Sequence, residues 1–235
     1  MDAVLLFSGQ GAQKVGMGKD LYDQYPVAKA LIEQADKALG ESLSAVMFEG
    51  PGEELTRTCN CQPALYVHGL ACLAVLKELV PSLNPVAAAG LSLGEFTAHA
   101  AAGTYSFEEG LRLVQKRGAF MEEACNATKG TMAAMIGGTD ENVIKLAQEC
   151  DVDVANFNCP GQTVVSGTEE GVAKAVAGAK AAGCKIAKKL NVAGAYHSRL
   201  MHSAMVKLAE ELKNISFGTP SMPVYCNYEA RVVEG

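Results

Sequence analysis

Tryptophan is absent from this 235-residue sequence, and aromatic residues make up only 6% of it. Because nucleic-acid bases stack on aromatic side chains, their scarcity disfavours a protein that binds single strands. An excess of positive charge is also missing, since the formal net charge is −6 at pH 7. Proteins hold a phosphate backbone through clustered cations, and we therefore expect no nucleic-acid partner.

Metal-binding patterns are missing as well. The sequence has eight cysteines, but no two of them form a C-x2-C pair. A single residue separates Cys59 from Cys61, and no second cysteine pair or histidine pair completes a zinc site with them. We therefore predict no metal site and expect mostly buried, reduced thiols, as is usual in the cytosol.

Long hydrophobic runs are lacking, although 49% of the residues are hydrophobic. No run reaches the roughly 18 residues that a membrane-spanning helix needs. Residues 1–7 carry no basic group and turn polar at Ser8, which is typical of a first strand and not of a signal peptide. These absences predict a soluble, cytoplasmic protein with no membrane partner.

Short apolar runs alternate with helical patterns over the first half of the chain. We expect strands at 3–7 and 86–89, and helices at about 26–39, 63–79, 95–102 and 107–124. The continuous apolar run at 3–7 is typical of a strand buried on both faces. Pro63 suits the first position of its helix, and Ser106 with Glu109 forms a capping box that begins the last one.

The pattern changes after Asn126. Strands are expected at 131–136, 152–156, 163–166 and 185–190, with helices at 140–149 and 169–182 between them; this order is typical of a ferredoxin-like insert. A helix at 198–212 and a strand at 224–226 resume the first pattern. We predict an α/β fold with a large α/β-hydrolase-like subdomain around a parallel sheet (1–127 and 192–235) and a small ferredoxin-like α+β subdomain (128–191).

A G-x-S-x-G motif occupies residues 90–94, between a predicted strand and a predicted helix. In this context the glycines permit a sharp turn that exposes the Ser92 hydroxyl as a nucleophile. The N–H of Leu93 then lies at a helix N-terminus, where the helix dipole favours a negative oxygen. The alternative is a glycine-rich packing turn in which Ser92 only caps the helix.

A nucleophilic serine needs a base, and the chain has four histidines, at 68, 99, 197 and 202. His99 lies on the same helix as Ser92, about 10 Å further along, and His68 lies in the middle of another helix. His197 follows a predicted strand and precedes a helix, where sheet proteins present catalytic groups. We predict His197 as the base, with His202 as a distant second choice.

An esterase would place an acidic residue between the serine and the histidine to orient the imidazole. The candidates Asp140, Asp151 and Asp153 fall in the insert and resemble turn or cap residues. No acid is therefore identified, which argues against a standard esterase.

Several segments together carry a family resemblance. They are Phe-Ser-Gly-Gln-Gly-Ala-Gln at 7–13, Gln-Pro-Ala-Leu at 62–65, Gly-Leu-Ser-Leu-Gly-Glu at 90–95 with Ala-Gly at 102–103, Arg-Gly at 117–118, Asn-Phe-Asn-Cys-Pro-Gly-Gln at 156–162 and His-Ser-Arg-Leu-Met at 197–201. With these segments in this order, the chain resembles the malonyl-CoA:acyl carrier protein transacylases, the acyltransferase family of fatty-acid and polyketide synthesis.

The resemblance implies a role for each matching residue. Ser92 would be the acylated nucleophile and His197 the general base and acid. The backbone N–H groups of Gln10 and Leu93 would form the oxyanion hole. Leu93 after the nucleophile and Tyr196 before the histidine resemble the members that take malonyl groups.

The resemblance also implies how substrate is held. Arg117 would bind the free carboxylate of a malonyl group, which suits a guanidinium because it keeps its charge and offers paired donors. Gln62, Asn156 and Asn158 would line the cleft between the subdomains. The implied reaction moves malonyl from malonyl-CoA to the phosphopantetheine thiol of acyl carrier protein, so a coenzyme A thioester is a substrate and no cofactor is bound.

Two departures from the family pattern stand out. Leu91 precedes the nucleophile where the family commonly has histidine. The family also continues well beyond the point that matches Asn227, so we expect this chain to lack the closing segment, whose carbonyl group orients the histidine. Two alternatives therefore stay open: a serine hydrolase with the same Ser–His pair, and a catalytically weak scaffold that docks acyl carrier protein.

Overall fold

A computed structural model of the chain describes residues 1–232. The chain divides into two compact units, Met1–Ala119 with the residues from Glu210 onward, and Phe120–Ala209. We call them unit 1 and unit 2. The subdomain boundaries expected from the sequence, 128 and 191, both fall inside unit 2 and stay a prediction.

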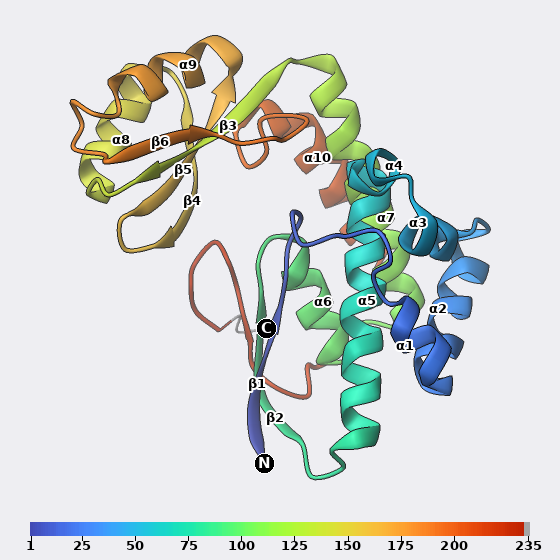
Figure 1. The fold of residues 1–235 in the computed structure, drawn as a ribbon. Coiled ribbons are helices and arrows are strands. Elements are labelled where there is room, and N and C mark those ends of the chain that lie inside the picture. Colours follow the sequence, from blue (N-terminus) through green and yellow to red (C-terminus); the bar gives the residue numbers. More distant parts are fainter. Residues whose placement is uncertain (233–235) are drawn as a thin grey trace. The chain divides into compact units, whose positions relative to one another are not determined.

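Unit 1 contains the predicted parallel sheet. Its strands are β1 (Asp2–Phe7), β2 (Asn84–Gly90) and the short β7 (Val224–Tyr225), in the order β1-β2-β7. Helices α5 (Thr58–Leu79) and α6 (Leu93–Ala101) lie on one side of β1 and β2 (Figure 1). The first half of the predicted architecture, a parallel sheet covered by helices, is thus confirmed.

The residues that the structure describes cover only one of the two faces of this sheet. Leu5 of β1 is buried, whereas its neighbours Val4 and Leu6 are 56% and 78% exposed. The expectation of a strand buried on both faces is therefore wrong here. A continuous apolar run shows that a strand can be buried, but it does not show which faces the rest of the chain covers.

Helix α5 is the centre of the unit 1 core. Its Tyr66 and Val67 are fully buried and pack with Ile32, Met47 and Leu111 from other helices. Among the described residues, α5 is one helix whose length and composition would suit a membrane span, which the sequence analysis did not anticipate. Most of that stretch is buried inside the protein, as in the core helix of a globular unit.

The start of α5 differs from the prediction. The helix begins at Thr58, so Pro63 lies inside it and not at its first position. Arg57 separates it from α4 (Gly52–Thr56) with an extended ψ of 134°. The sequence signal from proline was misleading because a proline within the second turn removes only one backbone donor, and the buried side chains around it hold the helix.

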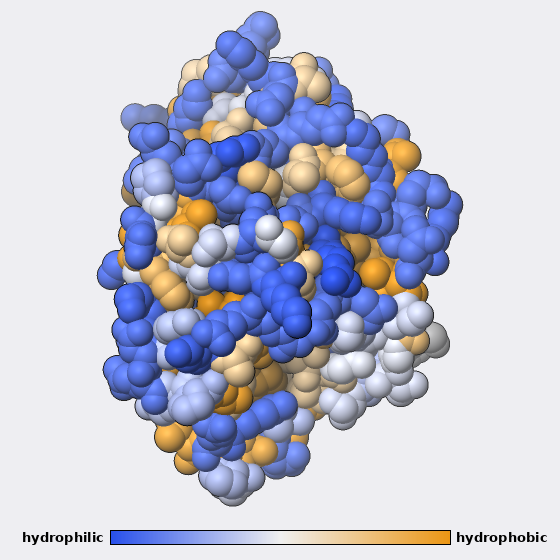
Figure 2. Space-filling view, turned by 90° about the vertical axis from the view of Figure 1, so that its right-hand side faces the viewer, coloured by the Kyte–Doolittle hydropathy of each residue, from blue (hydrophilic) through white to orange (hydrophobic). Residues whose placement is uncertain are grey.

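The other helices of unit 1 cover α5. Helix α2 (Pro26–Leu39) has its predicted bounds and ends at Gly40 in a left-handed conformation. The short helices α1 (Lys19–Gln24), α3 (Leu43–Glu49) and α4 were not predicted, because five to seven residues carry little periodicity. On the side that carries α2, hydrophilic side chains cover most of the surface, with hydrophobic ones scattered between them (Figure 2).

Helix α7 (Phe107–Ala127) starts where the capping box predicts. The backbone N–H of Ser106 donates to Glu109 Oε2 (3.1 Å), and the N–H of Glu109 donates to Ser106 Oγ (3.2 Å). These reciprocal bonds satisfy two donors that a helix N-terminus leaves unpaired. The helix carries Arg117 in its middle.

Unit 2 has the βαββαβ order of a ferredoxin-like fold. Its elements are β3 (Gly130–Ile136), α8 (Asp140–Glu149), β4 (Asp153–Cys159), β5 (Gln162–Thr168), α9 (Glu169–Gly178) and β6 (Ile186–Lys189). The antiparallel sheet runs β4-β5-β3-β6. The predicted α+β arrangement is confirmed, although α9 ends four residues earlier than the expected 182.

The helix expected at 198–212 is divided in two. A short 3-10 helix, η1 (Arg199–Met201), precedes α10 (His202–Leu212). Ser198 caps η1, because its Oγ accepts a hydrogen bond from the N–H of Leu200 (3.2 Å). His197 therefore directly precedes Ser198, the residue that caps η1.

Candidate active site

The carboxyl ends of three parallel strands place their loops at one edge of the unit 1 sheet. The register pairs Phe7 with Gly90, and Ala89 with Tyr225. Loops that follow the carboxyl ends of neighbouring parallel strands meet, and sheet proteins bind ligands there. The three loops carry Gln10, Ser92 and Asn227, respectively.

Ser92 occupies the sharp turn that the G-x-S-x-G motif predicts. Its backbone has φ 53° and ψ −101°, a sparsely populated conformation that costs a non-glycine residue about 1–3 kcal/mol. Gly90 permits the turn, since a Cβ at this position would overlap the backbone of Gly94. The N–H of Leu91 still pairs with the carbonyl of Phe7 (3.1 Å), which joins the turn to the sheet.

Arg117 lies directly beside Ser92. Its Nη2 donates a hydrogen bond to Ser92 Oγ (3.0 Å), and its Nη1 donates to Oε1 of Gln62 (2.7 Å). The guanidinium carbon also lies 5.1 Å from the centre of the Phe96 ring, within the range of a cation–π contact. Three residues that the sequence analysis selected, Ser92, Arg117 and Gln62, are thus brought together in unit 1.

The charge of Arg117 is buried without a carboxylate partner. The side chain is 8% exposed, and within residues 1–232 it forms no ion pair. Burial lowers the pKa of Arg117 to about 10, while the charge of Glu95 acts in the opposite direction. A buried cation held by neutral oxygens is costly, and an incoming anion would offset that cost.

Gln10 and Leu93, the expected oxyanion donors, occupy suitable backbone positions. Leu93 is the first residue of α6, so its N–H is one of the donors that a helix leaves unpaired. Gln10 lies in a turn after β1 in which the N–H of Ala12 approaches the carbonyl of Gly9 (3.4 Å). A function for either N–H stays a prediction.

His197 lies in unit 2, in the segment between β6 and η1. It has a left-handed backbone conformation with φ 55°, which is uncommon outside glycine and often marks functional positions. The preceding Tyr196 is buried in an apolar cluster of unit 2 that also holds Cys125. Ser198 closes the turn, since its Oγ donates to the carbonyl of Ala195 (2.7 Å).

Arg199 fastens the His197 segment to the rest of unit 2. Its backbone N–H and its guanidinium both donate to the carboxylate of Asp153 (2.7 and 2.8 Å), and its Nη1 donates to Asp151 (2.7 Å). Asp151 lies in a turn with φ 53°, as expected, whereas Asp153 lies on β4; both carboxylates bind the residue two positions after His197. Asp140 is not the cap of α8 but its first helical residue, because Thr139 caps the helix; Asp140 accepts a hydrogen bond from Thr163 Oγ1 (2.9 Å).

The other histidines have ordinary structural contacts. His99 Nδ1 lies 3.2 Å from Thr104 Oγ1, and burial lowers the pKa of His99. His68 packs against Cys72, and burial likewise lowers the pKa of His68. His202 begins α10 in unit 2.

Asn156 and Asn158 both lie on β4, which continues beyond the expected end at 156. The segment 156–162 forms a hairpin, in which β4 extends to Cys159 and β5 begins at Gln162. Asn158 Nδ2 donates to the Gln162 side chain (3.3 Å). Pro160 and Gly161 form the tight turn between the two strands.

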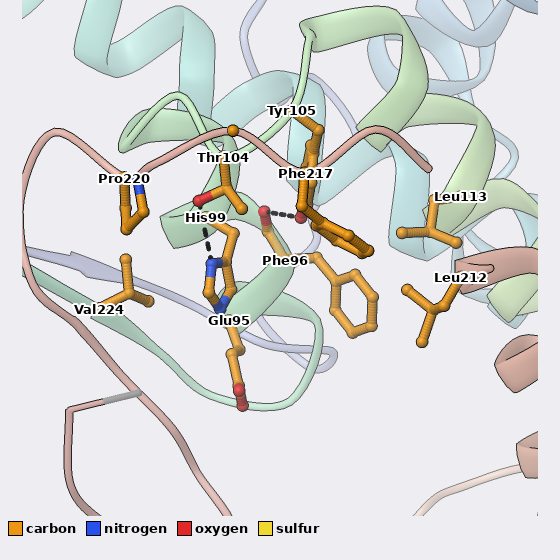
Figure 3. A pocket seen from close by; sticks show the side chains of 11 residues that line it. Glu95, Phe96, His99, Thr104, Tyr105, Leu113, Leu212, Phe217, Pro220 and Val224 are labelled. Atoms are coloured by element: carbon orange, nitrogen blue, oxygen red, sulfur yellow. Dashed lines mark hydrogen bonds between the residues drawn. The ribbon is translucent and has the colours of Figure 1, made fainter. Parts of the chain in front are cut away.

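A cavity of about 390 Å³ in unit 1 has Phe96 in its wall, but none of the predicted site residues lines it. Its walls are mostly apolar and include Leu113, Leu212 and Phe217 (Figure 3). The Tyr105 hydroxyl on its wall donates to the carbonyl of Phe96 (2.6 Å), which holds the helix that bears this ring. The cavity therefore lies beside Phe96, whose ring contacts Arg117, and not at Ser92.

Two residues next to the predicted site residues were not predicted: Phe96, which contacts Arg117, and Asn227, which contacts the Ser92 turn. The ring of Phe96 faces Arg117, and the side chain of Asn227 is hydrogen-bonded to the turn that holds Ser92. One signal could have found Asn227: it is the first amide residue after a short buried strand, at the edge where parallel strands present functional groups.

None of the eight cysteines forms a disulfide, and Cys61, Cys125 and Cys184 are buried. Residues 1–232 contain no group of three or more metal-ligating side chains that could hold an ion.

Comparisons with known proteins agree with this geometry. The acyl transferase domain family matches residues 4–234. The chain is 45% identical to a malonyl CoA-acyl carrier protein transacylase of Bacillus subtilis, over 97% of this chain and 73% of that protein. A solved malonyl CoA-acyl carrier protein transacylase from Coxiella burnetii superposes with a TM-score of 0.94 at 36% identity, covering 99% of this chain and 74% of that one.

A second solved structure contains a partner. It is a type II polyketide synthase acyl-carrier protein in complex with its malonyl-transacylase, which matches with a TM-score of 0.93 at 37% identity, covering 99% of this chain and 76% of that one. Both the family match and the relatives cover almost all of this chain, with the Ser92, Arg117 and His197 segments inside the matched range. The chain therefore belongs to the acyl transferase family, among the malonyl CoA-acyl carrier protein transacylases.

Proposed function

We propose that this protein transfers a malonyl group from malonyl-CoA to the phosphopantetheine thiol of an acyl carrier protein, through an ester on Ser92. The observation that carries the proposal is the buried guanidinium of Arg117. Within residues 1–232 its hydrogen-bond partners are the neutral side chains of Gln62 and Ser92, and its Nη2 lies 3.0 Å from Ser92 Oγ. A substrate with a carboxylate close to its thioester fits both residues together. The names of the relatives, and the solved complex with an acyl-carrier protein, support the same substrates and partner.

The reaction has two half-reactions that use the same serine. Ser92 Oγ attacks the thioester carbon of malonyl-CoA, its proton passes to a base, and coenzyme A leaves as a thiol after taking that proton. The carrier-protein thiol then attacks the serine ester, its proton passes to the same base, and the base returns that proton to the departing oxygen of Ser92. Ser92 is restored, and the malonyl thioester has moved to the carrier.

The N–H groups of Leu93 and Gln10 stabilise the negative oxygen of each tetrahedral intermediate in this proposal. Leu93 is suited to it because it begins α6, where the helix dipole and an unpaired N–H favour an anion. Loss of one such donor typically costs about 10²–10³ in rate.

His197 is the general base and acid in this proposal. Two features support it: its unusual left-handed backbone, and the anchoring of its segment by Ser198 and Arg199. A base has to be held in one orientation to move protons efficiently, and these contacts restrict the backbone on the carboxyl side of the imidazole.

Arg117 selects the acyl group. A malonyl carboxylate can accept charge-assisted hydrogen bonds from the guanidinium, whereas an acetyl group leaves the cation buried and unpaired. Gln62 holds Arg117 in place through its Nη1. We keep Asn156 and Asn158 as further substrate contacts supported by the family motif, and Tyr196 and Leu93 as features of the malonyl-type members.

The proposed reaction needs coenzyme A only as part of the substrate and uses no bound cofactor. One relative is named for polyketide biosynthesis, and another is named only by its reaction. Fatty-acid and polyketide synthesis both use malonyl-CoA as the acyl donor in this proposal. We propose the cytoplasm as the location, because none of the eight cysteines forms a disulfide, as expected in a reducing compartment.

The test is to follow the acyl group by intact mass. The protein is mixed with malonyl-CoA or acetyl-CoA, and the adduct is located by peptide mapping before and after addition of acyl carrier protein. We expect a malonyl adduct on Ser92 that moves to the carrier, and no adduct in Ser92→Ala. Rapid loss of the adduct to water, without transfer, would identify a hydrolase instead, and no adduct at all would identify a non-catalytic scaffold.

A further inference from the structure

The backbone around Ser92 requires support from outside the turn. Its φ of 53° lies in a region that few serines adopt, and such a conformation persists only when the surroundings hold it. The N–H groups of Gly94 and Glu95 bond back to the carbonyls of Leu91 and Ser92 (2.9 and 3.2 Å), which closes the first turn of α6. These bonds leave the carbonyl of Gly90 and the N–H of Ser92 still to be satisfied.

One side chain satisfies both groups. Asn227 Nδ2 donates to the carbonyl of Gly90 (2.6 Å), and its Oδ1 accepts from the N–H of Ser92. The carboxamide thus bridges the residues on either side of Leu91. The orientation of the amide follows from its partners, because a carbonyl can only accept and a backbone N–H can only donate.

Asn227 is itself held by two elements of unit 1. Strand β7 pairs with β2 through Ala89 and Tyr225, which brings the residues after β7 to the carboxyl edge of the sheet. The backbone N–H of Asn227 donates to Oε2 of Glu95 (3.1 Å), in the first turn of α6. A closed set of contacts therefore links Ser92, Asn227 and Glu95, although 135 residues separate the first two along the chain.

We propose that Asn227 is a positioning residue for acyl transfer, whose carboxamide holds Gly90 and Ser92 in the strained turn and is itself held by Glu95. This inference rests on the proposed role of Ser92 as nucleophile. Asn227 does not contact Arg117, so it acts on the aim of Ser92 Oγ and not on the capture of the malonyl carboxylate. It also occupies the N–H of Ser92, which leaves the N–H of Leu93 as the donor of this turn for the oxyanion.

The first variant is Asn227→Ala, with Tyr228→Ala as the matched control. Tyr228 is the next residue, and its side chain is 96% exposed. Single-turnover malonylation of Ser92 is followed by intact mass over a range of malonyl-CoA concentrations. We expect the maximal rate of Asn227→Ala to fall about 10- to 100-fold, the effect of two neutral hydrogen bonds, with an unchanged half-saturating concentration. Tyr228→Ala should match the original protein.

The second variant, Asn227→Asp, separates positioning from general stability. A carboxylate can accept from the Ser92 N–H but repels the Gly90 carbonyl, so we expect a low maximal rate at neutral pH. The protonated acid is a near-isostere that can donate to Gly90 while it still accepts from Ser92. The rate of Asn227→Asp relative to the original protein should therefore rise as the pH is lowered from about 8 to 5, while the same ratio for Asn227→Ala stays flat.

The outcomes distinguish this inference from the function on which it rests. If the original protein malonylates Ser92 and Asn227→Ala keeps its full maximal rate, Asn227 is not a positioning residue and the proposed function stands. A slow Asn227→Asp whose relative rate does not change with pH would mean that the substitution acts through folding alone, which also overturns the inference. If Ser92 is not acylated in the original protein, the proposed function fails and the inference fails with it.

Discussion

Replacing Arg117 by methionine should separate stability from specificity. The folded-state pKa of Arg117 is lowered to about 10 by burial, so the charged form is penalised in the folded protein. The shift corresponds to a cost of about 3 kcal/mol, which the folded protein carries at neutral pH and loses only at strongly alkaline pH. Methionine fills similar volume without a charge and removes this cost.

The substitution also removes favourable contacts. These are the two hydrogen bonds to Gln62 and Ser92, about 1 kcal/mol each, and the cation–π contact with Phe96, about 1 kcal/mol. Gains and losses nearly cancel, so we expect the free energy of unfolding to change by less than about 2 kcal/mol. In a chain of this size that corresponds to a melting-temperature shift of no more than about 4–8 °C.

Catalysis should respond quite differently. A bound malonyl carboxylate would lose two charge-assisted hydrogen bonds of about 1.5–3 kcal/mol each, so kcat/KM for malonyl-CoA should fall about 10²- to 10⁴-fold. Acetyl-CoA, which has no carboxylate, should react no more slowly than before. Arg117→Met and the exposed Arg112→Met, on the same helix, are compared by thermal unfolding and by the rates of Ser92 acylation. A strongly destabilised Arg117→Met that retains its preference for malonyl-CoA would refute the reasoning.

Two further predictions concern other parts of the molecule. Burial raises the pKa of Cys61 to about 12, so at pH 8 iodoacetamide should modify the exposed Cys159 at least tenfold faster than Cys61 in the folded protein; equal rates by peptide mapping would contradict this. The pKa of Asp153 is lowered: burial raises it, but the hydrogen bonds and charge of Arg199 outweigh burial. The contacts between Arg199 and Asp153 stabilise the folded protein fully above the ordinary carboxyl pKa of about 4. This stabilisation is lost as the pH falls through the lowered pKa of Asp153 in the folded protein. Arg199→Ala should therefore be slightly less stable than the original protein at pH 7, and this difference should vanish in acid; denaturant titrations at several pH values measure it. The maximal acylation rate of Arg199→Ala should also fall severalfold, because Arg199 holds the segment that carries His197, and single-turnover kinetics measure this rate.

Local signals in the sequence predicted most elements and their order. Helix α2, the capping box at Ser106 and the βαββαβ order of unit 2 depend on periodicity, caps and turns within a few residues, and all are present. The errors have a common cause. The open face of β1 and the internal position of Pro63 depend on what distant segments cover, which a local pattern does not contain.

The same contrast between local signals and distant contacts applies to the residues of the candidate site. Ser92 could be found because a nucleophile turn needs a short motif, and Arg117 could be given a role only through the family resemblance, since a lone arginine on a helix has no local signature. Asn227 has only its place after a short strand as a signal, because its contacts with Gly90 and Ser92 exist only once β7 pairs with β2. Residues that act through the backbone of another residue leave the weakest trace in a sequence, even when they lie next to the chemistry.

The spacing of Arg117 and Ser92 bears on acyl-chain length as well as charge. A guanidinium has five N–H donors, and the structure uses one for Ser92 and one for Gln62, so a carboxylate can bind to the remaining ones without first displacing Ser92. With Nη2 only 3.0 Å from Ser92 Oγ, the carboxylate and the attacked carbonyl must lie close together, as they do when a single methylene separates them. A longer diacid would have to bend to keep both contacts, and a displacement of the reacting carbon by about 1 Å is enough to cost about 10²-fold in rate. Under the proposed function, one pair of side chains therefore discriminates against acetyl groups by charge and against longer dicarboxylic groups by distance.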